Sequence, residues 1–143
     1  MNSKKITNEE ELNQAFEIRK EVFVKEQGVP LSDEFDEYDH LDGRCEHLLV
    51  YYNDQAVGTS RIRTVDEYGK LERICLLKDF RSLGLGKVIV LALEEIAKEQ
   101  GLSKVKLHGQ THAEGFYQNL GYQTASAVFM EDGIPHVLMT KSL

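Results

Sequence analysis

The feature that most restricts the fold is a glycine-containing loop between a predicted strand and a predicted helix. The apolar run 71–77 has the character of a strand, and residues 87–100 have the apolar spacing of a helix that ends at Gly101. Between them, residues 81–87 read Arg-Ser-Leu-Gly-Leu-Gly-Lys. Backbone N–H groups at a helix start attract anions, and glycine lets a phosphate approach them closely. The sequence therefore predicts a phosphate-binding loop, with an ordinary turn at a helix start as the alternative.

The loop follows neither of the common nucleotide-binding patterns. A Walker A loop needs glycine in place of Arg81 and Ser or Thr in place of Val88. A dinucleotide-binding loop needs glycine in place of Ile89. If the loop binds a phosphate, we therefore expect the phosphate of another kind of cofactor.

The remaining elements predict a mixed α/β domain. Thr7 with Glu10 and Thr111 with Glu114 have capping-box spacing, which predicts a first helix over about 8–23 and a last helix from Thr111. Turn residues separate further predicted strands at 48–52, 56–65, 104–107, 122–129 and 136–141. A length of 143 residues suits one domain, 1–143, with antiparallel strands at both ends.

Charge and hydropathy exclude several classes of partner. With 24 acidic and 17 basic residues the net charge is -7, so a nucleic-acid backbone would repel the protein. There is no apolar stretch of membrane-spanning length and no apolar run near the start, so we expect a cytoplasmic protein that does not bind membranes. Cys45 and Cys75 lack CxxC spacing, and we expect both thiols to be reduced.

The residues present do not fit two other kinds of site, a zinc site and a serine-hydrolase active site. His108 and His112 have the spacing of a zinc-binding helix, but Gly109 interrupts the helix and no metalloprotease glutamate follows. The segment 58–62 resembles a serine-hydrolase turn until Ile62, where glycine is required. We therefore expect neither a metal site nor a serine nucleophile.

Two longer segments resemble the GNAT (Gcn5-related) N-acetyltransferase superfamily. Residues 81–86 resemble its Arg-x-x-Gly-x-Gly loop for the acetyl-CoA pyrophosphate. Residues 110–122 resemble its Asn-x-x-Ala-x-x-Phe-Tyr-x-x-x-Gly-Phe segment, with Gln110 in place of Asn. Segments 22–27 and 129–136 are similar to the bacterial ElaA-type subgroup. The resemblance covers nearly the whole chain and implies a mostly antiparallel central sheet with a splayed strand, flanked by helices.

The resemblance implies an acetyl-CoA-dependent N-acetyltransferase that needs no metal. Its acceptor would be a primary amine of a small molecule or peptide, which attacks the thioester directly. The pantetheine would pair with the backbone of the splayed strand, and the pyrophosphate would bind the loop. The residues expected on the cofactor side are Ile74, Leu76, Arg81, Gly84, Gly86, Lys87 and Gln110. A non-catalytic acyl-CoA-binding or sensor module is the alternative, and the sequence leaves homodimerisation open.

Two residues are candidates for proton transfer. Tyr117 falls where the superfamily often has the tyrosine that protonates the CoA thiolate, although its apolar stripe also suits a core position. Glu72 is an acid within an apolar strand, and alternation places it on the same face as Ile74 and Leu76. It is either the general base or part of a structural ion pair with a nearby arginine: Arg61, Arg63 or Arg73.

The acceptor side is less well defined. His47 opens the first predicted hairpin and His136 follows the turn of the last one, so both are candidates to line an acceptor pocket. Seven acids lie in 33–46, which the resemblance places on the acceptor side. This segment either attracts a cationic amine or is a solvated loop.

Overall fold

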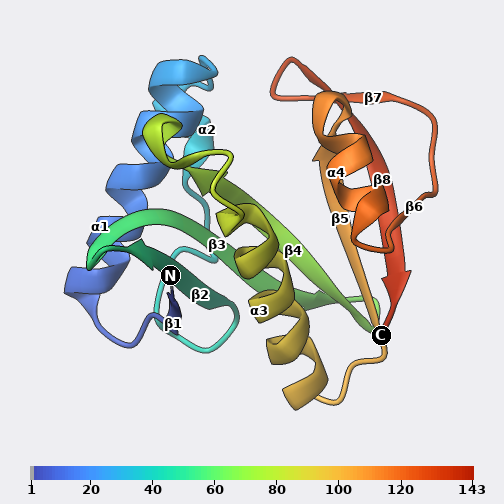
Figure 1. The fold of residues 1–143 in the computed structure, drawn as a ribbon, viewed down its shortest axis with the longest axis horizontal. Coiled ribbons are helices and arrows are strands. Elements are labelled where there is room, and N and C mark those ends of the chain that lie inside the picture. Colours follow the sequence, from blue (N-terminus) through green and yellow to red (C-terminus); the bar gives the residue numbers. More distant parts are fainter. Residues whose placement is uncertain (1) are drawn as a thin grey trace.

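An eight-stranded sheet runs through the structure, a computed structural model that describes residues 2–143 (Figure 1). The strand order is β1-β2-β3-β4-β5-β8-β6, and β7 pairs with β8. The strands are β1 (Asn2–Lys5), β2 (Glu46–Tyr52), β3 (Gln55–Val65), β4 (Tyr68–Leu76), β5 (Lys104–Gln110), β6 (Gln123–Thr124), β7 (Phe129–Glu131) and β8 (Ile134–Ser142). All neighbours are antiparallel except β4 and β5. The predicted mixed, mostly antiparallel sheet is confirmed.

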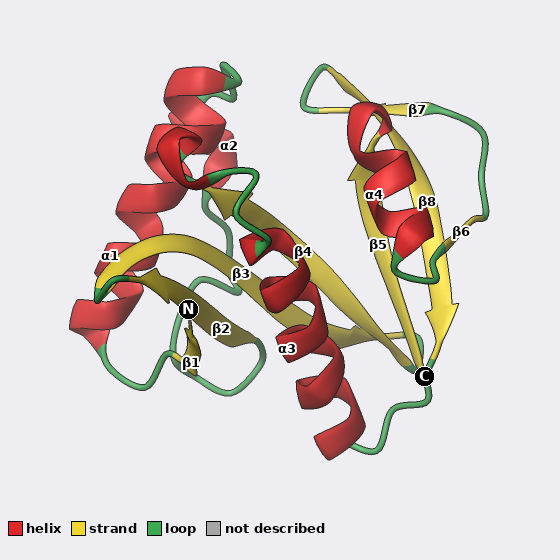
Figure 2. Cartoon of the chain, viewed as in Figure 1, coloured by secondary structure: helices red, strands yellow, loops and turns green. Residues whose placement is uncertain are grey.

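Helices flank this sheet (Figure 2). They are α1 (Glu9–Arg19), which continues into a π-helical segment (Lys20–Glu26), then α2 (Leu31–Glu34), α3 (Leu85–Glu99) and α4 (Glu114–Asn119). Leu48 and Val50 of β2 pack in the core cluster that contains α3 and α4 residues, whereas Leu49 packs with α1. Since strand side chains alternate, α1 covers the face opposite to α3 and α4. Within residues 2–143, no helix has the length and apolar character needed to span a membrane.

Helix starts differ in detail from the prediction. The N-cap of α1 is Asn8, whose Oδ1 accepts a hydrogen bond from the Glu11 amide at 2.8 Å. Glu11, not Glu10, accepts a hydrogen bond from the Thr7 amide at 3.1 Å. The predicted capping box is therefore displaced by one residue, because Asn8 caps a helix as well as threonine does.

The C-terminal elements also differ. No side chain caps α4, which begins at Glu114 after a 3-10 turn, so the second predicted capping box is wrong. The predicted strand 122–129 is two short strands, because Ser126 Oγ accepts a hydrogen bond from the Leu138 amide and replaces the backbone ladder there. Strand β1, which pairs with β2, was not predicted from the sequence.

The parallel strands β4 and β5 separate after a short paired stretch, as Figure 1 shows. Their last pair is Leu71 with Leu107, and the rest of each strand faces a gap. In β4 the pairing with β3 shifts so that Arg73 and Ile74 together oppose one β3 residue, and Arg73 has φ of 55°. This is a β-bulge, which bends a strand away from its neighbour. It confirms the predicted splayed strand.

The bulge also changes which side chains share a face. Leu71, Ile74 and Leu76 pack with the cluster under α3, whereas Cys75 packs with the cluster under α1. The expectation that Glu72 shares a face with Ile74 and Leu76 is therefore wrong. A bulge inserts one residue, and the alternation on which that expectation rested does not continue across it.

The end of β4 packs closely on β3, which allows a stability test. A methyl group built on Gly58 would lie 2.6 Å from Leu76 Cδ2 and 2.9 Å from the Cys75 carbonyl oxygen. We expect Gly58→Ala to lower the free energy of unfolding by about 1–3 kcal/mol in urea denaturation. Gly115→Ala is the control, because no heavy atom lies within 4 Å of its added methyl group. Equal stability of the two variants would contradict this packing.

Candidate functional site

A cavity of about 810 Å³ opens where β4 and β5 separate. It is lined by the far half of β4, the loop before α3, the end of β5, α4 and the turn between β7 and β8. Ten predicted site residues line it: Glu72, Ile74, Leu76, Arg81, Gly84, Gly86, Lys87, Gln110, Tyr117 and His136. Of the predicted site residues, all of which the structure describes, only His47 is not part of this lining.

The start of α3 is open to this cavity. Gly84 is the N-cap of α3 with φ of 80°, no side chain caps the helix, and a methyl group built on Gly84 would meet nothing within 4 Å. The first-turn N–H groups of the helix therefore remain available to an anion. At Gly86 an added methyl group would lie 3.1 Å from Phe116 Cζ, so this glycine lets α3 approach α4. Lys87 adds a cationic side chain to the lining.

Arg81 is held by two partners at the end of β4. Its Nε and Nη2 donate to the Leu76 carbonyl oxygen at 3.1 and 2.8 Å, and Nη1 and Nη2 donate to the Glu26 carboxylate at 3.0 Å each. The guanidinium thus ties β4 to the π-helical segment after α1. Its charge is shared with Glu26, an interaction that was not predicted from the sequence.

Gln110 spans the cavity in a similar way. Its Nε2 donates to Gln27 Oε1 at 2.9 Å, and its Oε1 lies 2.7 Å from His112 Nε2. The end of β5 is thereby connected to the end of the π-helical segment. Gln110 also lines the cavity.

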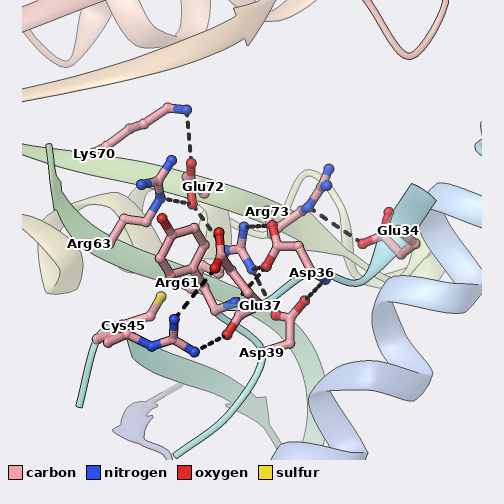
Figure 3. Close-up of polar contacts among 12 residues, drawn as sticks. Glu34, Asp36, Glu37, Asp39, Cys45, Arg61, Arg63, Lys70, Glu72 and Arg73 are labelled. Atoms are coloured by element: carbon pink, nitrogen blue, oxygen red, sulfur yellow. Dashed lines mark hydrogen bonds and ion pairs between the residues drawn. The ribbon is translucent and has the colours of Figure 1, made fainter. Parts of the chain in front are cut away.

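Glu72 lies among three cations, as Figure 3 shows. It accepts hydrogen bonds from Arg61 Nε at 3.1 Å and Arg63 Nε at 3.0 Å, and Lys70 Nζ lies 2.9 Å away. Burial raises the pKa of Glu72, but these cations outweigh burial and hold the pKa below its ordinary value. Of the two roles predicted for Glu72, the ion pair with arginine is therefore present, and its partners are Arg61 and Arg63. Arg73 instead lies 3.7 Å from Glu34.

The acidic segment 33–46 is neither a fully solvated loop nor a free anionic surface (Figure 3). Glu34 and Asp39 are 0% and 6% exposed. Arg19 donates to Glu34 at 2.9 Å and to Asp39 at 2.6 Å, and Arg61 donates to Asp39 at 2.8 Å and to Asp36. The solvated-loop expectation is therefore wrong for Glu34 and Asp39, whose arginine partners come from distant parts of the chain. Asp36 is exposed and lines the cavity.

Tyr117, which belongs to α4, lies in the wall of the cavity. Its ring packs edge-on against Phe116 and Tyr122, and its hydroxyl has no hydrogen-bond partner among the described residues. Burial raises the pKa of Tyr117 to about 12, so the phenol keeps its proton at neutral pH. Tyr122, in contrast, donates to Glu94 at 2.8 Å. Tyr117 is therefore the tyrosine with a free hydroxyl at the cavity.

Of the two histidines predicted to line an acceptor pocket, His136 lines the cavity and His47 does not. His47 is buried, its Nε2 lies 3.0 Å from the Tyr38 carbonyl oxygen, and burial lowers its pKa. It stays apart from the cavity that it was predicted to line. His136 lines the cavity, with Nδ1 2.7 Å from the Ile134 carbonyl oxygen.

His108 and Glu131 both line the cavity and contact each other, and the sequence did not predict this pair. His108 Nδ1 lies 2.9 Å from Glu131 Oε1, and the other Glu131 oxygen lies 3.7 Å from His136 Nε2. The sequence pattern had connected His108 only with His112. Alternation along β5 could have placed His108 on the same face as Gln110, but the approach of Glu131 depends on the fold.

The described part of the chain contains no cluster of three or more His, Cys, Asp or Glu residues arranged to hold a metal ion. Cys45 and Cys75 are separate, buried free thiols. Burial raises the pKa of each to about 12, which leaves both as unreactive thiols at neutral pH.

Comparison with known proteins shows the family of the chain. A family model described as an acetyltransferase (GNAT) domain matches residues 4–143, and the chain belongs to the GNAT acetyltransferase family. A provisionally named acetyltransferase of Bacillus subtilis (strain 168) is 67% identical over 141 residues, covering 99% of this chain and 96% of the relative.

Solved structures share the fold. Escherichia coli ElaA matches with a TM-score of 0.85 and 28% identity over 99% of both chains. A GNAT family acetyltransferase from Elizabethkingia anophelis, solved with acetyl-CoA bound, matches with a TM-score of 0.60 over 70% of this chain and 77% of that one. At 19% identity, this second match shows likeness of fold alone.

The charges around Glu72 predict a pH-dependent contribution to stability. Because the folded pKa of Glu72 lies below its ordinary 4.5, the carboxylate stabilises the fold above that pH, and this is lost as the pH falls through the folded pKa. We expect Glu72→Gln to lower the free energy of unfolding at neutral pH by roughly 1.5–3 kcal/mol. We also expect it to weaken the decline in stability in acid.

Urea unfolding at several pH values from neutral into acid measures both effects. Glu67→Gln is the control, because Glu67 is exposed. If the two variants lose the same stability at every pH, the ion pairs of Glu72 do not contribute as the distances indicate.

Proposed function

We propose that the protein transfers the acetyl group of acetyl-CoA to a primary amine of a small molecule or peptide. One observation carries the proposal: a single cavity connects the open start of α3 with the gap between β4 and β5. The first feature suits a pyrophosphate, and the second suits an extended chain that ends in a thioester. An acyl-CoA combines both groups in one molecule.

The residues of the cavity fit this molecule. Gly84 leaves space at the helix start, and Lys87 supplies positive charge beside it. Beyond Leu71, β4 has no pairing with β5, so its backbone near Ile74 can pair with a pantetheine chain as with an added strand. Acetyl-CoA supplies the activated thioester, whereas binding, orientation and proton transfer depend on this chain.

Tyr117 is proposed as the proton donor to the departing sulfur. Its raised pKa of about 12 keeps the hydroxyl protonated at neutral pH, as a donor must be. The same desolvation raises the basicity of a thiolate that forms beside it. Glu72, which is held by three cations, is assigned to positioning Arg61, Arg63 and Lys70 on the acceptor side rather than to removing protons.

The alternative is a module that binds acyl-CoA without catalysis. CoA release from acetyl-CoA, followed with a thiol reagent and a panel of primary amines, separates the two functions. The transferase releases CoA at a rate that depends on the amine. A sensor binds acetyl-CoA, as calorimetry would show, with no amine-dependent release.

A substitution in the loop before α3 tests the proposed pyrophosphate site. Gly84→Asp places a carboxylate at the proposed pyrophosphate site, and we expect at least a 10-fold loss of acetyl-CoA affinity by calorimetry. Gly101→Asp is the matched control, because Gly101 has a similar φ of 78° and equally open surroundings outside the cavity lining. Unchanged affinity in a folded Gly84→Asp protein would place the cofactor elsewhere.

Substitutions of Tyr117 and Tyr122 test the proposed proton donor. Tyr117→Phe removes a hydroxyl without a hydrogen-bond partner among the described residues, so we expect unchanged stability and acetyl-CoA affinity with kcat lower by about 100- to 10,000-fold. Tyr122→Phe removes the hydrogen bond to Glu94, so we expect lower stability with kcat retained. The opposite pattern in thermal unfolding and turnover would make Tyr117 a structural residue.

A further inference from the structure

His108 occupies the point at which the two parallel strands separate. Leu71 and Leu107 form the last pair of β4 with β5, so Glu72 and His108 are the first residues of each strand beyond it. Both line the cavity. An acceptor that reaches the gap from this end must therefore pass close to these two side chains.

Glu131 fixes the state of the His108 ring. The hydrogen bond with His108 lowers the pKa of Glu131 by more than burial raises it, so the pKa lies below its ordinary value. Glu131 is therefore ionised at neutral pH and can only accept, so Nδ1 of His108, at 2.9 Å, is the donor. Nε2 then carries the lone pair in the neutral ring. It has no hydrogen-bond partner among the described residues.

His108 and Tyr117 approach the gap from opposite faces of the sheet. A methyl group built on Gly109 would lie 3.3 Å from Tyr117 Cδ2, so Gly109 faces α4. Because strand side chains alternate, the neighbouring His108 faces the other side, where Phe129 packs edge-on against its ring. The gap between β4 and β5 thus has a proton donor on one face and a potential proton acceptor on the other.

Glu72 is the competing group, and its contacts weaken it as a base. Its carboxylate is shared by Arg61, Arg63 and Lys70, all within 3.1 Å. Cations stabilise the ionised form and so reduce its tendency to take a proton. His108 instead has one carboxylate partner, at Nδ1, and its Nε2 has no hydrogen-bond partner among the described residues.

We propose that His108 is the general base of the acetyl transfer and that Glu131 is its positioning residue. The inference rests on the proposed function. His108 Nε2 takes one proton from the acceptor ammonium and later passes it to water. The freed nitrogen pair forms the C–N bond with the thioester carbonyl carbon, and the C–S bond breaks with its electron pair on sulfur. The sulfur takes the Tyr117 proton, and the second proton lost by nitrogen returns through water to the Tyr117 oxygen.

Other charged groups lie near His108 and contribute to the pH dependence of the reaction. Glu131 comes from β7 and His136 from β8, and the two lie 3.7 Å apart at their nearest atoms. Lys70 on β4 is close enough to lower the pKa of Glu131. Its own partner is Glu72. The nearest of these charges to the His108 ring is the Glu131 carboxylate.

The test compares His108→Gln and Glu131→Gln with His40→Gln, whose histidine is exposed and outside the cavity lining. The probes are acetyl-CoA with n-butylamine, putrescine, L-lysine, glucosamine and kanamycin, and the readout is kcat/KM against pH. We expect His108→Gln to lower kcat/KM at neutral pH by about 100- to 10,000-fold. The difference should shrink as the pH approaches the pKa of the amine itself, because a neutral amine needs no base.

Glu131→Gln should lower kcat while the KM for acetyl-CoA stays unchanged, because an amide can accept or donate and no longer fixes the proton on Nδ1. This second variant keeps the test valid if His108→Gln does not fold. Acetyl-CoA affinity should stay unchanged in all three variants. A merely structural role for His108 would lower stability without moving the pH profile.

The results distinguish a failure of the proposed function from a failure of the assignment of His108 as the base. A wild-type protein that binds acetyl-CoA but acetylates none of the amines overturns the proposed function and this inference with it. An active wild type whose pH profile is unchanged in His108→Gln and Glu131→Gln overturns only the assignment of the base.

Discussion

Parallel pairing between β4 and β5 ends at Leu71 and Leu107, and the rest of the site depends on what holds β4 beyond that point. A strand that leaves its neighbour exposes backbone groups that need other partners. Side chains provide part of this support, since Arg81 donates to the Leu76 carbonyl and both Arg61 and Arg63 hold Glu72. The far half of β4 is thus fixed in place while its edge stays free for a ligand.

The buried charges extend this support across α1, α2 and β3. Arg19 of α1 binds Glu34 of α2 and also Asp39, which Arg61 of β3 shares. Burial lowers the pKa of Arg61, but the surrounding carboxylates outweigh it and hold the pKa above its ordinary value. Such a network has a high desolvation cost, and removing one member leaves an unpaired buried charge. Its geometry therefore sets the position of α1 and α2 relative to the cavity.

The parts of the fold that follow from local patterns were predictable from the sequence. The loop from Arg81, the helix behind it and the splayed strand follow from glycine spacing, apolar periodicity and the family resemblance. The face of Glu72 was not predictable, because one bulge residue reverses the alternation. The partners of the acidic segment were not predictable either, since Arg61 lies 22 residues from Asp39 in sequence. Long-range pairs of this kind depend on tertiary contacts.

The packing of the proposed acid against β5 depends on a single glycine. Gly109 lies between the face of β5 that meets Tyr117 and the face that carries its neighbour His108. An added methyl group there would lie 3.2 Å from Leu107 Cδ1 and 3.3 Å from Tyr117 Cδ2, so a larger residue would move the tyrosine away from the strand. Glycine instead lets the phenol ring pack directly on the backbone. The proposed acid therefore packs on one face of β5 and the proposed base extends from the other, which suits an amine arriving on one face and a thiol leaving on the other.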